Sequence, residues 1–261
     1  MKATFLDEII SVTSSRVKFL AKSERDDMAV RAREVRRKAE ALRLSKALEQ
    51  RARTNIIAEI KRASPSKGVI NDKINVAETA KMYEREGACA ISVLTEGKYF
   101  RGSIDDLRVV RRTVDVPILR KDFTVDEFQI YEAAAAGADA VLLIVAALSS
   151  ETLREFQSLA HQLGLDALVE VHTMAELAVA TTIEAKLIGV NNRDLKTFGV
   201  SLDVSRELIK HRPDGSLMIA ESGISSREQI DELRSLGFDG FLVGESLMRA
   251  GSMGKLKELA A

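Results

Sequence analysis

Charged and hydroxyl side chains follow directly on a short apolar run that begins at residue 56. The run reads Ile-Ile-Ala and continues as Glu59-Ile60-Lys61, and a turn from Ser64 to Gly68 comes next. Because side chains alternate along a strand, Glu59 and Lys61 share one face and Ile60 takes the other. An opposite-charge pair that faces a protein interior is costly. The segment therefore predicts either an ion pair that closes a strand or a site that needs both charges, with Ser64 supplying a hydroxyl.

Polar side chains also stand at or just beyond the ends of later apolar runs. They are Lys121 at 118–121, Glu170 at 167–171, Asn191 and Arg193 at 187–191, Glu221 and Ser222 at 217–221, and Glu245 at 240–243; Phe123 and Gly244 stand beside them. Any one of them could be a satisfied polar residue at a sheet edge. A barrel interior filled only for stability uses branched apolar residues there. Charges at the ends of five of eight strands therefore predict a catalytic site.

Eight strand-like runs alternate with amphipathic helical segments from residue 56 onward. We expect strands at 56–61, 90–95, 118–121, 140–145, 167–171, 187–191, 217–221 and 240–243. Gly87, Gly137 and Gly237 each end a helix shortly before the next strand, so one connecting device recurs along the chain. Eight strand–helix units in about 200 residues predict an α/β protein with a (β/α)8 TIM barrel. A doubly wound sheet is disfavoured because the chain has no G-x-G-x-x-G motif.

Capping signals predict where several helices begin. The pairs or alternatives are Thr4 with Asp7, Thr124 with Glu127, Ser225 with Glu228, and Ser149 or Ser150. In each pair, a hydroxyl and a carboxylate can satisfy free N–H groups of the first turn. We expect each of these positions to open a helix.

Residues 1–55 differ from the remainder and form an N-terminal helical extension. They contain 14 basic and 8 acidic residues, a net charge of +6, and show no strand pattern. Apolar residues at helical spacing follow residue 4, and a second helix is expected over 27–53. We expect the extension to cover the mouth of a barrel domain at 56–261 and to help hold an anionic substrate. A solvated helical arm and a nucleic-acid-binding arm are the alternatives, although the latter would lack interleaved aromatic residues.

The last two strands are followed by turns that can hold a phosphate group. Ser222 and Gly223 follow one strand, and Gly244 and Glu245 open a short extra helix after the next. In barrels of this class, phosphates commonly lie between these two loops on backbone N–H groups. We therefore expect Gly223, Gly244 and Glu245 to bind phosphate.

Composition limits the remaining functional classes. The 261 residues include 39 lysines and arginines and 39 aspartates and glutamates, so the net charge is zero. A neutral chain has no general attraction to nucleic acid or membranes. Cys89 is the single cysteine, which excludes an internal disulfide and fits a reducing cytoplasm. The N-terminus has no uncharged apolar core of signal-peptide length, and no run approaches the roughly 18 apolar residues of a membrane span. No histidine, cysteine and carboxylate spacing predicts a metal site, and His172 is expected to serve a loop or helix cap.

The strand-end motifs resemble those of the indole-3-glycerol phosphate synthase family in order and position. The first motif reads Glu-Ile-Lys-Arg-Ala-Ser-Pro-Ser-Lys-Gly. The later ones are Leu-Thr-Glu-Gly-Lys-Tyr-Phe, Ile-Leu-Arg-Lys-Asp-Phe, Leu-Val-Glu-Val-His, Gly-Val-Asn-Asn-Arg-Asp-Leu, Ala-Glu-Ser-Gly-Ile and Val-Gly-Glu-Ser-Leu-Met-Arg. The helical extension also matches, so the resemblance covers essentially the whole chain. Glu245 is a departure, since some members carry a serine there, and its carboxylate is expected to turn away from the phosphate.

The resemblance implies ring closure with decarboxylation and dehydration of 1-(2-carboxyphenylamino)-1-deoxyribulose 5-phosphate. The products are indole-3-glycerol phosphate, carbon dioxide and water. Lys121 would be the general acid, Glu170 would carry the proton work of dehydration, and Lys61 would hold the substrate carboxylate. The other implied contacts are orientation by Glu59, Asn191 and Ser222, charge from Arg193 and Glu221, a hydroxyl from Ser64, and aromatic packing by Phe100 and Phe123. The sequence leaves open which lysine donates a proton at each step.

The resemblance further implies a cytoplasmic monomer that uses no cofactor. Its partner would be a small phosphorylated substrate, with no nucleic acid or membrane and at most a weak association with other enzymes of its pathway. Another phosphate-binding barrel enzyme, such as phosphoribosylanthranilate isomerase, is the alternative activity. A basic helical interaction module is the alternative outside enzymology.

Overall fold

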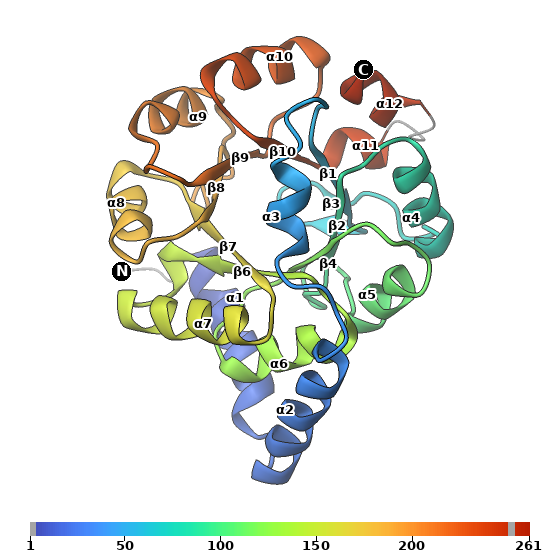
Figure 1. Cartoon of the computed structure of the whole chain (residues 1–261), viewed down its shortest axis with the longest axis vertical. Helices are drawn as coiled ribbons and strands as arrows, with labels where there is room; N and C mark the ends of the chain where they lie inside the picture. The colour runs from blue at the N-terminus through green and yellow to red at the C-terminus, as the bar shows by residue number, and fades with distance from the viewer. Residues whose placement is uncertain (1–3, 250–253) are drawn as a thin grey trace.

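A closed barrel of eight parallel strands forms the centre of the protein (Figure 1). The computed structural model describes residues 4–249 and 254–261. Strand β1 lies between β10 and β4, and the other neighbours follow in chain order. The barrel strands are β1 (Ile56–Ile60), β4 (Ala90–Leu94), β5 (Ile118–Lys121), β6 (Ala140–Ile144), β7 (Asp166–Val171), β8 (Leu187–Asn191), β9 (Leu217–Glu221) and β10 (Gly240–Val243). The predicted (β/α)8 barrel is confirmed, and each predicted strand bound lies within one residue of the observed one.

Helices surround the barrel and a small hairpin follows β1. The hairpin strands are β2 (Ala63–Ser64) and β3 (Gly68–Val69). The helices after the barrel begins are α4 (Val76–Arg85), α5 (Ile104–Arg111), α6 (Glu127–Ala136), α7 (Ser150–Gln162), α8 (Met174–Thr182), α9 (Asp203–Leu208), α10 (Arg227–Leu236), α11 (Glu245–Arg249) and α12 (Lys255–Ala260), with short 3₁₀ turns η1 (Val145–Ala147) and η2 (Ile209–His211). Among the described residues, no helix is both long enough and apolar enough to cross a bilayer.

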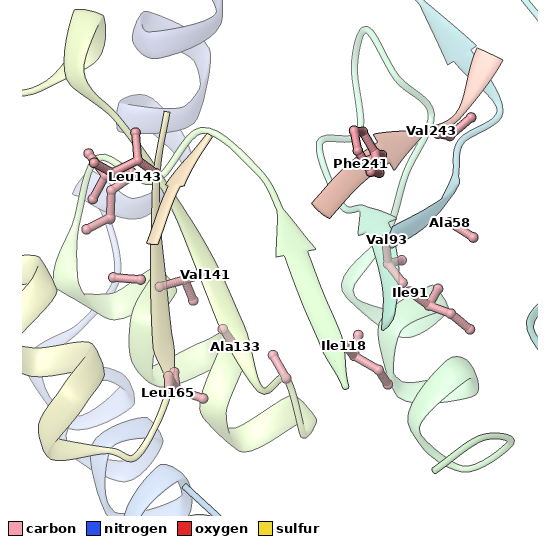
Figure 2. Packing of buried hydrophobic residues seen from close by; sticks show 14 of the residues in the cluster. Ala58, Ile91, Val93, Ile118, Ala133, Val141, Leu143, Leu165, Phe241 and Val243 are labelled. Carbon is pink, nitrogen blue, oxygen red and sulfur yellow. The ribbon is translucent and has the colours of Figure 1, made fainter. Parts of the chain in front are cut away.

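Two apolar cores follow from the alternation of side chains along the strands. Ile118 and Val141 point outward and pack against the helices with residues such as Ala133, as Figure 2 shows. Leu119 and Leu142 point inward and fill the barrel itself. Full burial of such a side chain contributes about 1.5–3 kcal/mol. This inner core ends below the carboxyl ends of the strands, where inward positions become charged.

The helix caps confirm two predicted signals and correct two. Ser149 is the N-cap of α7, where its side chain accepts from the Thr152 N–H. Thr4 and Asp7 form the predicted capping box at the start of α1. The N-cap of α6 is Asp126 rather than Thr124, which is buried. The N-cap of α10 is Ser226, paired with Gln229, rather than Ser225 with Glu228. In both wrong cases the capping group lies one or two residues further along, because the loop needs those residues to leave the strand.

The predicted second helix at 27–53 is wrong, since the chain forms two helices with a turn between them. After α1 (Phe5–Lys18), α2 (Lys22–Arg36) and α3 (Arg43–Leu48) are separated by a turn in which Leu42 adopts a left-handed φ of 53°. The Arg36 guanidinium is buried and donates to the carbonyls of Ala138, Leu163 and Gly164 beneath the barrel. We call these contacts of Arg36 the Arg36 latch. The latch ends α2 and turns the chain across the barrel.

The three N-terminal helices contact three different parts of the barrel. Helix α3 crosses the near end of the barrel in Figure 1, where Leu44 and Leu48 join the inner core at the amino ends of the strands. Helix α2 packs along α6, and Arg25 pairs with Asp126 at 2.7 Å. Helix α1 lies toward the opposite end and supplies Phe5, Leu6 and Ile9 to the cavity described next. Of the three helices, α1 alone contributes to that cavity.

Candidate active site

A cavity of about 740 Å³ opens at the carboxyl ends of the barrel strands. This is the size range of small-molecule sites. Every residue that the sequence put forward as a candidate for catalysis, substrate binding or phosphate binding lines it. They are Glu59, Lys61, Ser64, Phe100, Lys121, Phe123, Glu170, Asn191, Arg193, Glu221, Ser222, Gly223, Gly244 and Glu245. The structure thus brings the whole candidate set together, while their chemical roles stay predictions.

Lys121 stands among carboxylates on the cavity floor. Its Nζ lies 2.7 Å from Glu170 Oε2 and 3.4 Å from Glu221 Oε2. Burial by itself lowers the pKa of Lys121, but Glu170, Glu221 and Glu59 outweigh it and raise the pKa above the ordinary lysine range. Lys121 therefore carries its proton at neutral pH, which is the state a general acid needs.

The pKa values of the two glutamates beside Lys121 are shifted in opposite directions, although Lys121 lowers both. Burial raises the pKa of Glu170, but Lys121 and His172 outweigh burial and hold it below the usual range, so Glu170 is ionised. Burial raises the pKa of Glu221, and the neighbouring carboxylates of Glu170 and Glu59 raise it further. Two carboxyl groups that share one cation and titrate apart can act as a base and as an acid.

A second lysine–glutamate pair lies on β1 and in the loop after it. Lys61 Nζ is 2.5 Å from Glu59 Oε1, and the lysine side chain is 15% exposed. Gly244 makes room for this pair, since a Cβ at residue 244 would lie 2.3 Å from Glu59 Oε1. Gly189 does the same for the carboxylate of Glu221, which a Cβ would approach to 2.0 Å. These two glycines are therefore required by the buried carboxylates.

The loops after β9 and β10 carry the candidate phosphate site. Ser222 and Gly223 have left-handed φ angles of 67° and 80°. The Asn192 side chain donates to the carbonyls of Glu221 and Ser222 and fixes this turn. Glu245 begins α11, so its backbone N–H is one of the free donors of that first turn.

The carboxylate of Glu245 pairs with two cations at the cavity, and its expected turn away from a bound phosphate stays a prediction. It lies 3.4 Å from Arg193 Nη2 and 3.6 Å from Lys67 Nζ, and all three residues line the cavity. Arg193 also donates to Ser66 Oγ at 3.1 Å, which links the loops after β1 and β8. Arg193 and Lys67 thus attract the Glu245 carboxylate. The sequence motif alone could not reveal these two contacts.

Aromatic side chains form one wall and part of the rim. The Phe100 and Phe123 rings are 6.1 Å apart with an interplanar angle of 38°. Glu96 holds the loop that carries Phe100, since its carboxylate accepts from the backbone N–H groups of Tyr99 and Phe100. The arrangement offers a flat apolar surface beside Lys121, as a planar aromatic substrate requires.

Sequence reasoning missed several residues that complete the cavity. Phe5 of α1 packs edge-on against Tyr99 at 4.7 Å and Phe198 at 5.3 Å between ring centroids. Helical spacing after Thr4 was the available signal for α1, but no local pattern places its apolar face over β4 and β8 loops. His172 was assigned to a loop or cap, and it also lies 3.4 Å from Glu170.

Among the described residues, no cluster of histidine, cysteine and carboxylate side chains could hold a metal ion.

The barrel and its charged cavity place the protein among (β/α)8-barrel enzymes, whose active sites lie at this end of the strands. The family profile of indole-3-glycerol phosphate synthase matches residues 6–259. The chain is 53% identical over 209 residues to indole-3-glycerol phosphate synthase from Aquifex aeolicus, covering 79% of this chain and 81% of that protein. It is 49% identical over 210 residues to the enzyme of the same name from Carboxydothermus hydrogenoformans, covering 80% of each. The chain belongs to the indole-3-glycerol phosphate synthase family.

Solved structures of more distant barrels share the fold. The 3-hexulose-6-phosphate synthase of Salmonella typhimurium matches with a TM-score of 0.63 at 16% identity, covering 79% of this chain and 96% of that one. The N-acetylmannosamine-6-phosphate 2-epimerase of Clostridium perfringens matches with a TM-score of 0.60 at 16% identity, covering 77% and 90%. At this identity the likeness establishes the barrel and nothing about the reaction.

Proposed function

We propose that this protein closes the indole ring of 1-(2-carboxyphenylamino)-1-deoxyribulose 5-phosphate and releases carbon dioxide and water. The observation that carries the proposal is the Lys121–Glu170 pair in a cavity that also holds Lys61, an aromatic wall and two candidate phosphate loops. A lysine that keeps its proton can protonate the ketone oxygen while the ring carbon attacks. An ionised glutamate beside it can accept a proton when the hydroxyl departs as water.

The other residues of the cavity bind and orient the substrate in this proposal. Lys61 holds the anthranilate carboxylate until it leaves, and Phe100 and Phe123 stack beside the ring. Backbone N–H groups at Gly223, Gly244 and Glu245 receive the phosphate. The residues that orient the chain between these ends or complete the charge are Glu59, Ser64, Asn191, Ser222, Arg193 and Glu221. Each of these groups lines the same cavity, and this shared location supports the assignments.

A direct assay tests the activity. Purified protein is incubated with the carboxyphenylamino substrate, and the indole chromophore is followed by absorbance. Phosphoribosylanthranilate serves as the comparison substrate, since its isomerisation forms no carbon–carbon bond. Turnover of the first substrate alone supports the proposal. Turnover of the second alone would assign the site to the isomerase reaction.

We further propose a monomer that acts in the cytoplasm without a cofactor, with at most weak association with other enzymes of its pathway. The basic extension makes internal contacts, through Arg25 with Asp126 and Arg36 with backbone carbonyls, and this argues against a nucleic-acid arm. Light scattering of the purified protein with and without RNA tests both statements.

Removing residues 1–20 should raise KM while the barrel stays folded. That deletion takes away α1 and with it Phe5, Leu6 and Ile9 from the cavity. A loss of about 1.4 kcal/mol in substrate binding raises KM tenfold, and we expect at least that change. A longer deletion of residues 1–40 also removes the buried Arg36 latch, so it should lower the melting temperature much further. Equal KM values for the full chain and the shorter deletion would mean that α1 has no part in binding.

Replacing Glu245 with glutamine should strengthen phosphate binding. The carboxylate now neutralises Arg193 and Lys67, and a substrate phosphate must displace it or lie beside it. Glutamine keeps the backbone N–H and removes the competing charge. Partly exposed ion pairs contribute about 0.2–1 kcal/mol, so we expect KM and the inhibition constant of inorganic phosphate to fall by roughly 2–5-fold. If inhibition by phosphate weakens instead, the carboxylate supports the site rather than competes with it.

A further inference from the structure

His172 lies between the carboxylates of Glu170 and Glu176, just after the end of β7. Its side chain is 10% exposed, and it follows Glu170 by two positions at the end of β7. The ring Nε2 is 3.4 Å from Glu170 Oε1, and Nδ1 is 3.0 Å from Glu176 Oε2. Glu176, in the first turn of α8, also accepts from the His172 backbone N–H at 2.7 Å. The ring is therefore anchored on one edge and faces Glu170 with the other.

Each oxygen of Glu170 faces a different nitrogen. Oε2 accepts from Lys121 Nζ at 2.7 Å, and Oε1 faces His172 Nε2. That buried Nε2 atom has no hydrogen-bond partner within the described part of the chain, so its contact with Glu170 is electrostatic. A carboxylate engaged from both sides has little freedom to rotate, which holds its lone pairs in one direction.

The histidine ring adds positive charge at this position. Burial lowers the pKa of His172, but hydrogen bonding to Glu170 and Glu176 outweighs burial and raises the pKa to about 10. The ring is then an imidazolium at neutral pH. The charged groups around Glu170 are Lys121 from β5, Glu221 beyond it on β9, Glu59 on β1, and His172 with Glu176.

We propose that His172, anchored by Glu176, is a positioning residue that orients Glu170 and keeps it ionised during the reaction. The inference rests on the proposed function, in which Lys121 gives a proton to the substrate oxygen. At that moment Lys121 becomes neutral, and Glu170 loses its nearest cation. His172 then supplies the remaining positive charge beside Glu170, so the carboxylate stays ready to accept the proton released in dehydration. Direct transfer over the 2.7 Å contact returns that proton from Glu170 to Lys121, and the departing hydroxyl takes its second proton from solvent to leave as water.

A purely structural role would produce many of the same contacts. Glu176 accepts the His172 N–H just before the N-cap of α8, Thr173, so His172 could serve only to begin that helix. Two substitutions separate the roles by geometry. The amide of His172→Asn can take the place of Nδ1 and keep the contact with Glu176. The amide of His172→Gln reaches the place of Nε2 and keeps a donor toward Glu170.

Steady-state kinetics on the two variants test the orientation. We expect His172→Asn to lower kcat by about 10-fold, which is less than the ~10²–10⁴-fold of removing an acid–base group itself. KM should change less than kcat, and His172→Gln should retain more activity than His172→Asn. His211→Asn is the control, because His211 also faces a glutamate four residues away, at 3.8 Å from Glu207 on the surface. A histidine that only begins α8 would give the opposite order, with His172→Asn as active as the wild type.

The pH profile tests the charge. Removing a cation beside Glu170 raises its pKa, so the base becomes protonated at higher pH. The acidic limb of kcat should therefore move upward by about 1 pH unit or more in both variants. An acidic limb that stays in place would overturn the electrostatic part of the proposal.

An NMR titration gives a result that does not depend on turnover. The His172 imidazole of the wild-type protein should keep its protonated chemical shifts through pH 8.5, and Glu176→Gln should bring its titration to lower pH. A neutral His172 ring at pH 7 would overturn the inference even if the enzyme is active. A protonated ring in a protein that fails to turn over the carboxyphenylamino substrate would instead count against the proposed function alone.

Discussion

Lys121→Met should lower kcat by about 10²–10⁴-fold or more, with a much smaller change in KM. Methionine keeps most of the length and the apolar stem of lysine but cannot donate a proton. In the folded protein Lys121 is held protonated by Glu170, Glu221 and Glu59 despite its burial, so the group lost is a charged donor aimed into the cavity. The candidate phosphate loops are left intact, which is why binding should suffer less. Steady-state kinetics with thermal melts as a folding check measure the effect.

Lys61→Met is the matched comparison because Lys61 has the same chemistry in a second lysine–glutamate pair. Lys61 contacts Glu59 at the end of β1, whereas Lys121 on β5 contacts Glu170 on β7. If Lys61 grips the substrate carboxylate, its removal should raise KM as well as lower kcat. Near-normal kcat in Lys121→Met together with its loss in Lys61→Met would move the acid role to Lys61.

Strand patterns were sufficient to predict the barrel and the charged residues at the strand ends that line its cavity. A strand has a period of two, so the inward phase of Glu59, Lys121 and Glu170 could be read directly from neighbouring apolar residues. The carboxyl ends of parallel strands meet at one end of a barrel, so residues on different strands had to converge there. Gly137 and Gly237 adopt the left-handed conformation expected where a helix ends. These features are local or follow from the closure of one sheet.

Contacts that depend on how separate elements pack were not available from the sequence. The break between α2 and α3 exists because Arg36 binds carbonyl groups more than 100 residues away. Phe5 meets Phe198 only because α1 is laid over the barrel mouth. The carboxylate of Glu245 pairs with Arg193 and Lys67, which belong to other loops. In each case the deciding partner lies far away in the chain, where spacing rules carry no information.

The partners of Arg120 could not be predicted from the sequence either. Alternation along the strand points its side chain away from the cavity into an apolar layer. Its side chain is 1% exposed, and its guanidinium lies 3.0 Å from Asp122 Oδ2 and 2.6 Å from Glu132 Oε2. It also donates to Thr95 Oγ1 and the Gln129 carbonyl. This network joins the outer face of β5 to α6 and to the loop after β4. It therefore fixes the strand that carries Lys121 from behind.

Arg120→Met should consequently be among the most destabilising single substitutions in the barrel. It leaves two buried carboxylates, Asp122 and Glu132, without the cation they share, and removal of one partner from such a pair costs about 3–5 kcal/mol. At roughly 2–4 °C per kcal/mol, we expect the melting temperature to fall by about 6–20 °C. Arg206→Met is the control, since Arg206 also binds two carboxylates, Asp203 and Glu232, but on the surface. Chemical denaturation measures both variants, and equal losses of stability would show that burial does not set the strength of the Arg120 network.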